Sequence, residues 1–191
     1  MSNAAATTTT IGERCREWWT EYCGPTTGDA AVRARLRRCR STAEALTIAP
    51  AIGLARRLRA TRPERDGSAG RLERALDLAR LLAHVSSDVP ESVMRIAGYR
   101  HFPGERDTSD EGSRPVLSET RFKRLLLASP GEELLTLLVR LLAQVDGRAD
   151  IARLAQDVWW WSDKTRERWA FEYYAAGVAA PVQQDPDEER A

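Results

Sequence analysis

The stretch Val116–Tyr174 reads VLSETRFKRLLLASPGEELLTLLVRLLAQVDGRADIARLAQDVWWWSDKTRERWAFEYY, and it decides the fold. Leucines recur in it at helical spacing, and short polar segments containing Gly, Pro, Ser or Asp separate the apolar runs. Apolar residues that repeat about every 3.6 residues indicate amphipathic helices. No part of the stretch alternates apolar and polar residues as a half-buried strand does. The stretch therefore predicts a bundle of packed helices.

Four helices are expected in this stretch. The first begins at the N-cap Ser118, and its inward face carries Phe122, Leu125 and Leu126. Ser129-Pro130-Gly131-Glu132 has the pattern of a capping box, which predicts a second helix up to Val145. That helix is apolar except for one stripe, formed by Glu133, Thr136, Arg140 and Gln144. Asp150 and Ser162 are the expected caps of the last two helices.

Helical periodicity also runs through the first half of the chain. Helices are expected near residues 10–22, 29–40, 50–58 and 68–85, with short turns or helices at 42–46 and 91–97. The chain is thus predicted to be all-α, a helical bundle of about seven to eight helices with two small subdomains. The expected divisions are a disordered N-terminus or tag remnant, an N-terminal subdomain, a mobile loop, a C-terminal subdomain and a disordered acidic tail, at residues 1–10, 11–98, 99–116, 117–179 and 180–191.

The composition is typical of a globular protein that is not stabilised by disulfide bonds or metal ions. The chain has 191 residues and a net charge of +1, and it is long enough to bury a sizeable core. Cys15, Cys23 and Cys39 form no metal-binding spacing, so reduced thiols in a cytoplasmic protein are expected. No apolar run approaches the roughly 18 residues of a membrane span. No membrane partner is therefore predicted.

The basic residues are almost all arginine, and some of them lie in runs without acids. Lys123 and Lys164 are the two lysines. No Asp or Glu occurs between Val32 and Thr42, a run in which Arg33, Arg37 and Arg40 share one flank of a predicted helix. In the helix that begins at Ser118, three bases face away from the apolar side: Arg121, Lys123 and Arg124. Such faces are either solvated surfaces balanced by distant acids or contacts to phosphate.

The aromatic C-terminal helix adds a second cationic feature. Lys164 and Arg168 are one helical turn apart, and Phe171 lies close by, an arrangement that suits stacked bases and phosphates of a single strand. Most of the tryptophans are expected in the core. Trp160 is the expected exception, because helical geometry projects it outward, where it can line an interface between subunits.

The sequence contains no recognisable catalytic or metal-binding motif. Phosphate-binding loops, dinucleotide-binding glycine motifs and nucleophile elbows are all absent. His84 and His101 have no spaced cysteine or carboxylate partner, and His84 has the position of a structural residue at a helix end. The chain is therefore predicted not to be an enzyme and to bind neither a metal nor a cofactor.

Two other functions compete with binding of nucleic-acid backbone. A helix-turn-helix regulator needs Asn, Gln or Ser beside Arg on its recognition helix, and the R-A-R-L-R-R segment at 33–38 offers no such mixture. A helical adaptor that binds only protein would leave the arginines as solvated faces. Both alternatives remain open at this point.

The order of motifs resembles the CasB family, the small subunit of the type I-E CRISPR Cascade surveillance complex. The resemblance runs from Ile11 to Gly177 and is most specific in Ser118–Leu126 and Asp150–Tyr174. The motifs that carry it are R-A-R-L-R-R, S-E-T-R-F-K-R-L-L, L-V-R-L-L, D-I-A-R-L-A-Q-D-V-W-W-W and R-E-R-W-A-F-E-Y-Y. The loop 99–116 has no counterpart in it.

The resemblance implies a non-catalytic subunit with two helical subdomains. Two copies would pack head to tail, contact the large and backbone subunits, and hold the crRNA, the target strand and above all the displaced non-target strand of the R-loop. The residues that match basic positions of the family are Arg37, Arg38, Arg121, Arg124, Arg140, Lys164 and Arg168. Arg33 and Lys123 join this set from helix geometry alone. Contact with sugar-phosphate, without base reading, is the implied chemistry.

Overall fold

The computed structural model describes residues 9–59, 70–99 and 115–176. In these ranges the chain forms ten helices and two strands of two residues each, which confirms the all-α prediction. Two of the helices are the short turns expected near residues 42–46 and 91–97. The predictions for the N-terminus, the loop 99–116 and the acidic tail fall almost wholly outside the described residues.

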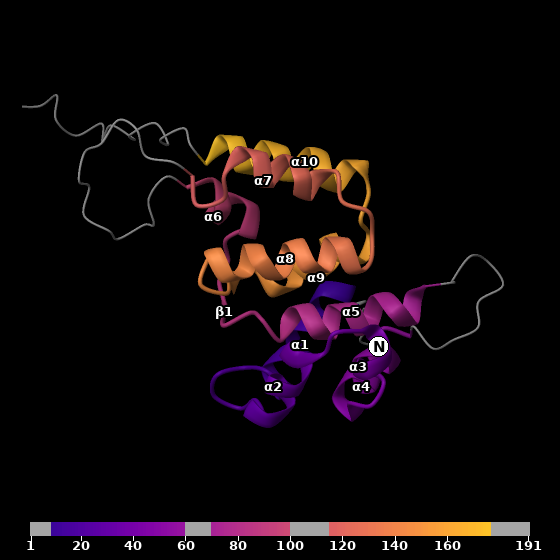
Figure 1. The fold of residues 1–191 in the computed structure, drawn as a ribbon. Coiled ribbons are helices and arrows are strands. Elements are labelled where there is room, and N and C mark those ends of the chain that lie inside the picture. The colour runs from indigo at the N-terminus through magenta and orange to yellow at the C-terminus, as the bar shows by residue number, and fades with distance from the viewer. Residues whose placement is uncertain (1–8, 60–69, 100–114, 177–191) are drawn as a thin grey trace, which may run out of the picture.

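The elements follow one another in a simple order. They are α1 (Ile11–Tyr22), α2 (Ala30–Arg38), α3 (Thr42–Ala45), α4 (Ala49–Arg57), α5 (Arg71–Leu82), β1 (Ser87–Asp88), α6 (Val93–Gly98), α7 (Glu119–Leu126), α8 (Glu132–Gln144), β2 (Arg148–Ala149), α9 (Ile151–Trp159) and α10 (Asp163–Ala175). Figure 1 shows α6, α7 and α10 at one end, α8 and α9 in the middle, and α1 to α5 at the other end.

Helices from both halves of the sequence pack on each other. α1 lies against α9, α5 contacts both α8 and α9, and α10 lies against α6. The two strands pair in parallel, with Ser87 opposite Arg148 and Asp88 opposite Ala149. This short pairing was not expected from the sequence, because two residues are too few to show a strand pattern. The division into two subdomains stays a prediction.

The N-terminal helix is fixed at its start and along its buried face. The Thr10 side chain caps α1 in a capping box with Glu13, and Trp18 is fully buried. The indole N–H of Trp18 donates a hydrogen bond of 2.8 Å to the carbonyl of Pro50, at the start of α4. Such a partner removes the cost of burying the polar edge of the ring. Burial and hydrogen bonding together hold α1 against α4.

The α1 and α9 backbones approach each other closely at Gly12. A Cβ atom at this position would collide with the backbone carbonyl of Ala152. The Gly12 N–H instead donates a hydrogen bond of 3.3 Å to the side-chain carbonyl of Gln156. Glycine at this crossing therefore lets the N-terminal helix sit directly on α9.

The predicted start of α8 was wrong in detail. Ser129 does not cap the helix, which begins at Glu132 after Gly131, a residue with a positive φ of 104°. The Glu133 carboxylate accepts a hydrogen bond of 3.1 Å from the backbone N–H of Ser129. A glycine that turns the chain in the left-handed region replaces the expected capping box, because that conformation costs glycine little.

Replacing Gly12 by alanine tests the helix crossing. We expect Gly12→Ala to lower the free energy of unfolding by about 2 kcal/mol or more, because the new methyl group meets rigid backbone. Denaturant-induced unfolding followed by circular dichroism measures the change.

Gly53 in α4 provides a matched control for this experiment. A Cβ atom there would meet nothing within 4 Å. Gly53→Ala should raise the free energy of unfolding by about 0.5–1 kcal/mol, as expected where a helix gains a better helix former. Equal effects at the two positions would contradict the close crossing at Gly12.

Candidate nucleic-acid interface

The arginines of α2 point outward from a helix that one leucine anchors. Asp29 caps the N-terminus, where its carboxylate accepts hydrogen bonds from two backbone N–H groups. Leu36 is the one fully buried residue of the helix. Four arginines in and just after α2 are exposed: Arg35, Arg37, Arg38 and Arg40. Within the described residues, no ion pair or hydrogen bond involves the guanidinium groups of the last three.

Arg33 has a different environment from its neighbours on α2. Its guanidinium donates hydrogen bonds of 3.0 Å to the carbonyl of Ala83 and 2.9 Å to that of Val85. These carbonyls follow the end of α5, where backbone acceptors lack partners inside the helix and a cation is favourable. Arg33 thus links α2 to the end of α5, although it also lines a shallow depression with Arg37 and Arg38.

A groove of about 390 Å³ lies between α7 and α8. Its floor is aliphatic and includes Leu117, Leu125, Leu137 and Leu141. Its rim carries the exposed Arg121, Arg124 and Arg140, and Ala143 and the half-buried Gln144 complete the lining. One arginine is lightly tethered, since Arg121 donates a hydrogen bond of 3.3 Å to Gln144. The groove therefore combines an apolar floor with a cationic rim.

A second groove, of about 350 Å³, lies between α2, α5 and α8. The residues that line it include Arg37, Arg40, His84, Thr136 and Arg140. Arg80 also lines it, but this side chain is 5% exposed and pairs with Glu132 at 2.7 Å and Asp77 at 3.3 Å. The ion pair between the buried Arg80 and the exposed Glu132 ties α5 to α8 and forms one wall of the groove.

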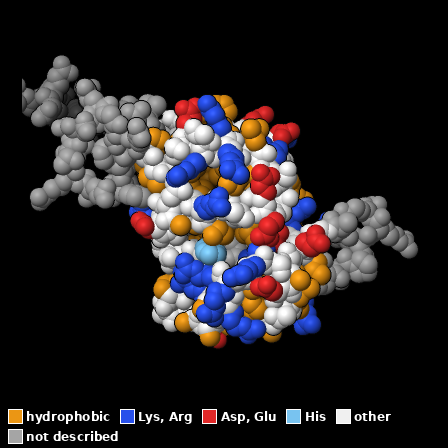
Figure 2. Space-filling view, in the orientation of Figure 1, with side chains coloured by type: hydrophobic (Ala, Val, Ile, Leu, Met, Phe, Trp, Pro, Cys, Tyr) orange, Lys and Arg blue, Asp and Glu red, His pale blue; other side chains and the backbone are white. Residues whose placement is uncertain are grey.

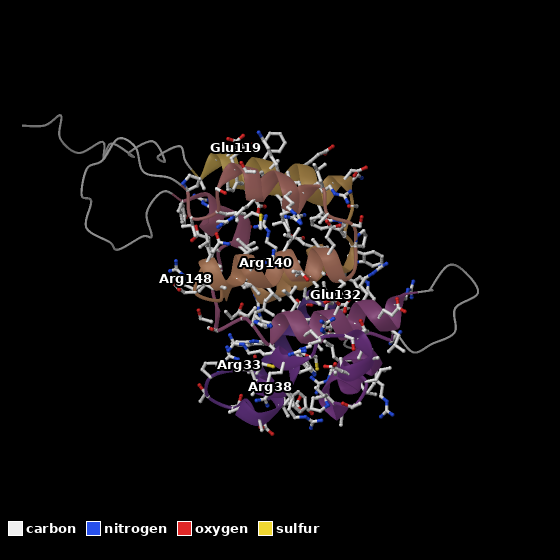
Figure 3. The ribbon with its side chains drawn as sticks, in the orientation of Figure 1. Arg33, Arg38, Glu119, Glu132, Arg140 and Arg148 are labelled. Carbon is white, nitrogen blue, oxygen red and sulfur yellow. The ribbon has the colours of Figure 1, made fainter. Side chains whose placement is uncertain are left out.

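Arg140 lines both grooves and joins them into one surface. We call Arg37, Arg40, Arg140, Arg121 and Arg124 the basic strip. Figure 3 places Arg140 on α8, between the α2 end and the α7 end of the molecule. In Figure 2, Lys and Arg side chains lie on both sides of the single His side chain that the view shows. Helix α2 and the sequence-distant pair α7 and α8 thus present cations on one face.

His84 lies in the wall of the second groove and is half-buried. Burial is the largest cause that lowers the pKa of its imidazole, and the nearby Arg37, Arg33 and Arg80 add to the effect. Together they lower this pKa from 6.5 to about 4. The imidazole is therefore neutral at pH 7 and adds no charge to the strip, although it can accept or donate hydrogen bonds there.

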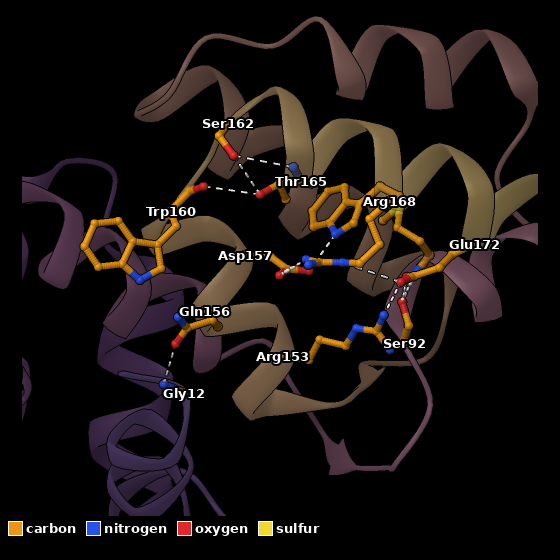
Figure 4. A network of polar contacts seen from close by, with 12 residues as sticks. Gly12, Ser92, Arg153, Gln156, Asp157, Trp160, Ser162, Thr165, Arg168 and Glu172 are labelled. Carbon is orange, nitrogen blue, oxygen red and sulfur yellow. Dashed lines mark hydrogen bonds and ion pairs between the residues drawn. The ribbon is translucent and has the colours of Figure 1, made fainter. Parts of the chain in front are cut away.

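Five of the predicted site residues lie outside both grooves. Arg33 and Arg38 line only the shallow depression on α2, and the other three lie elsewhere. Lys123 forms an ion pair of 2.7 Å with Glu119 on the same helix. Lys164 is exposed on the first turn of α10. Arg168 pairs with Asp157 and with Glu172, in the network that Figure 4 shows. Some predicted arginines therefore lie together along the grooves, whereas the other predicted cations are dispersed over the surface.

The predicted site residues omit several polar residues that line the grooves, among them Arg40, Gln144 and Thr136. Arg40 follows Arg37 on the same flank, so its spacing could have placed it in the set. Gln144 and Thr136 belong to the polar stripe of α8, which now proves to face both grooves. A polar stripe on an otherwise apolar helix was the sequence feature that could have predicted Gln144 and Thr136 as groove residues.

Other kinds of site find little support in the described residues. No group of three or more His, Cys, Asp or Glu residues in these ranges is placed to hold a metal ion. No helix in the same ranges is both long and apolar enough to cross a membrane. The three cysteines are free thiols, and burial raises the pKa of Cys15 and of Cys23 to about 12.

Fold and site together define an all-α protein with an arginine-lined face. The family model of CRISPR-associated protein Cse2 matches residues 32–174. The chain belongs to this family, also called CasB, which confirms the resemblance seen in the sequence. Among curated proteins, none matches the chain significantly.

A solved structure shares the fold. The chain is similar to a chain in the crystal structure of E. coli Cascade bound to a PAM-containing double-stranded DNA target, with a TM-score of 0.58 and 17% identity. The similarity covers 85% of this chain and 93% of the other. At this identity the match shows a common fold, and the roles of individual residues have to be argued from the present structure.

Replacing Arg33 should lower the stability of the fold and should have less effect on ligand binding. We expect Arg33→Gln to lower the free energy of unfolding by about 1–2 kcal/mol, because it removes charge-assisted hydrogen bonds to two carbonyls. Arg37→Gln, one turn further along α2, should change it by less than about 0.5 kcal/mol. Chemical denaturation of both variants measures the difference, and equal values would contradict the structural role of Arg33.

The low pKa of His84 predicts a loss of stability in mild acid. Its folded pKa of about 4 lies below the ordinary 6.5, so the unfolded chain binds the proton more readily. The stabilisation from neutral His84 is complete above about pH 6.5 and is lost as the pH falls toward 4. An NMR titration should place the imidazole midpoint near 4. A midpoint near 6.5, or a His84→Gln variant with unchanged pH dependence of stability, would contradict this environment.

Proposed function

We propose that this protein is the non-catalytic small subunit of a type I-E Cascade complex and binds nucleic-acid backbone along the basic strip. The observation that carries the proposal is the convergence of α2, α7 and α8 on two grooves that share Arg140. Arginines without acidic partners offer planar donor groups that suit phosphate oxygens. The strip presents few groups that can distinguish bases, so it binds without sequence specificity.

The free-energy balance of crRNA-guided DNA unwinding explains why such a surface would be useful. Exchanging DNA–DNA for RNA–DNA pairing is nearly balanced in free energy, so the opened duplex is easily lost. A surface that holds the displaced non-target strand opposes re-annealing and stabilises the R-loop. Phosphate contacts suit this role because the target sequence changes with each guide.

The partners follow from the same proposal. They are the crRNA, the target and non-target DNA strands, the large subunit, the backbone subunits and a second copy of this chain, all in the cytoplasm. Leu127 and Phe171 are 83% and 77% exposed and supply apolar surface for protein neighbours at the end of the molecule formed by α7 and α10. Protein contacts and strand contacts would thus use different faces.

Removing two arginines from the α7–α8 groove tests the strip. Arg121→Gln with Arg124→Gln should weaken binding of single-stranded DNA roughly tenfold at physiological salt, and should lower the slope of log K against log salt by about 1.4. Fluorescence anisotropy at several salt concentrations measures both quantities. In a complex reconstituted with the other Cascade subunits of the same organism, R-loop formation should fall equally for unrelated targets.

The chain offers a control with the same change in net charge. Arg56 and Arg59 are exposed at the end of α4 and line neither groove. Arg56→Gln with Arg59→Gln should leave affinity and salt slope nearly unchanged. Unchanged affinity in the groove variant would overturn the site, and absence of nucleic-acid binding both alone and in the complex would favour a protein adaptor. Preference for one palindrome over random DNA would favour a transcription regulator.

A further inference from the structure

We propose that the acidic segment 177–191 of this chain docks in the α7–α8 groove and there competes with nucleic acid. The proposal adds a regulatory contact to the basic strip, so its consequence for binding rests on the proposed function. The lining of the groove, the sequence of the segment and the position of the end of α10 favour this contact.

The groove matches a peptide better than it matches a sugar-phosphate chain alone. Its rim carries Arg121, Arg124 and Arg140, and none of the three forms an ion pair with an acid among the described residues. Its floor is leucine, which a phosphate backbone leaves unused. A ligand with an aliphatic side chain followed by several carboxylates would bury its apolar part on the leucines and pair its charges with the rim.

The segment 177–191 has this composition. Pro181 and Val182 supply the apolar part, and four carboxylates follow within the next seven residues: Asp185, Asp187, Glu188 and Glu189. Arg190 is the one base of the segment. Its negative charges are therefore complementary to the arginines of the rim. Its apolar residues come before the acids, so they would enter the groove first from the end of α10.

The end of α10 lies beside that entry. The Tyr173 hydroxyl donates a hydrogen bond of 2.6 Å to the carbonyl of Leu117, which itself lines the groove. Tyr174 also contacts the start of α7, through a hydrogen bond of 3.1 Å to Glu119. The chain beyond Ala176 thus starts next to the groove, at the same end of α7.

The connection is long enough. Asp185 follows Ala176 by nine residues, which span up to about 30 Å when extended. Helix α7 has eight residues and is about 12 Å long. The carboxylates can therefore reach every arginine of the rim without any change in the helices.

Tethering makes even a weak contact effective. A short flexible connection gives an effective concentration on the order of millimolar, so a contact with a dissociation constant of that size occupies the groove about half of the time. A several-fold stronger contact would lower the apparent affinity for nucleic acid about three- to tenfold, because only the open fraction binds. Strands held by the complete strip and by other subunits would displace the segment.

Cross-linking tests the docking without nucleic acid. A photo-reactive benzoylphenylalanine in place of Val182, in the full chain, should cross-link to peptides of α7 or α8 as mass spectrometry identifies them. A mixture of isotopically light and heavy chains shows whether the link is intramolecular. Cross-links confined to other helices, their absence, or links mainly between chains would overturn the proposal whatever the protein binds.

A double-variant comparison tests the competition. Neutralising the four acids, as Asp185→Asn, Asp187→Asn, Glu188→Gln and Glu189→Gln, should raise the affinity for a single-stranded oligonucleotide about three- to tenfold. The same change in the Arg121→Gln, Arg124→Gln background should raise it by much less, because the docking site is lost. An equal gain in both backgrounds would mean long-range repulsion and would overturn docking. If neither background bound the oligonucleotide, the proposed function would fail while the cross-linking result stood.

Discussion

The buried carboxylate of Asp157 is the interaction on which the packing of the last two helices depends. It is 5% exposed, accepts a hydrogen bond of 2.6 Å from the indole N–H of Trp169, and pairs with Arg168. A buried charge is tolerated only where donors surround it, and removal of one partner leaves the others uncompensated. Figure 4 shows that the same network continues through Glu172 to Arg153 and Ser92. It therefore fixes α10 against α9 and α6.

The arginines of this chain have two separate uses, and Arg168 in this network is an example of the first. Arg168, Arg80 and Arg33 are held by carboxylates or carbonyls of other elements, and they stabilise the packing of helices. Arg124 and Arg140 have no such partner among the described residues, and they lie on a groove rim. The difference lies in the tertiary neighbours and not in the residue type. A count of arginines on helix faces therefore overstates the cations that are free for a ligand.

Local patterns predicted what depends on local geometry. Helical periodicity predicted the all-α fold and the outward position of Trp160, which is 53% exposed. Residue type predicted the caps at Asp150 and Ser162. The partners of Arg33 lie about 50 residues away in sequence, so a helical wheel could only show that this side chain faced outward. The polar stripe that contains Arg140 was visible in the sequence. That it faces two grooves depends on where α2 and α7 pack, which no local pattern specifies.

The arginines of the basic strip repel one another, and this repulsion favours the binding of a polyanion. All five lie on adjoining grooves. One of them, Arg37, also lowers the pKa of His84, after the larger effect of burial. The fold has the means to avoid this repulsion, since Glu132 and Asp77 neutralise Arg80 at the edge of the same groove. A polyanion bound along the strip would remove the repulsion and favour the folded state, as any ligand selective for that state does. Binding and stability are thus coupled through the same arginines, and a polyanion that occupies the strip should hold α2, α7 and α8 together as well as being held by them.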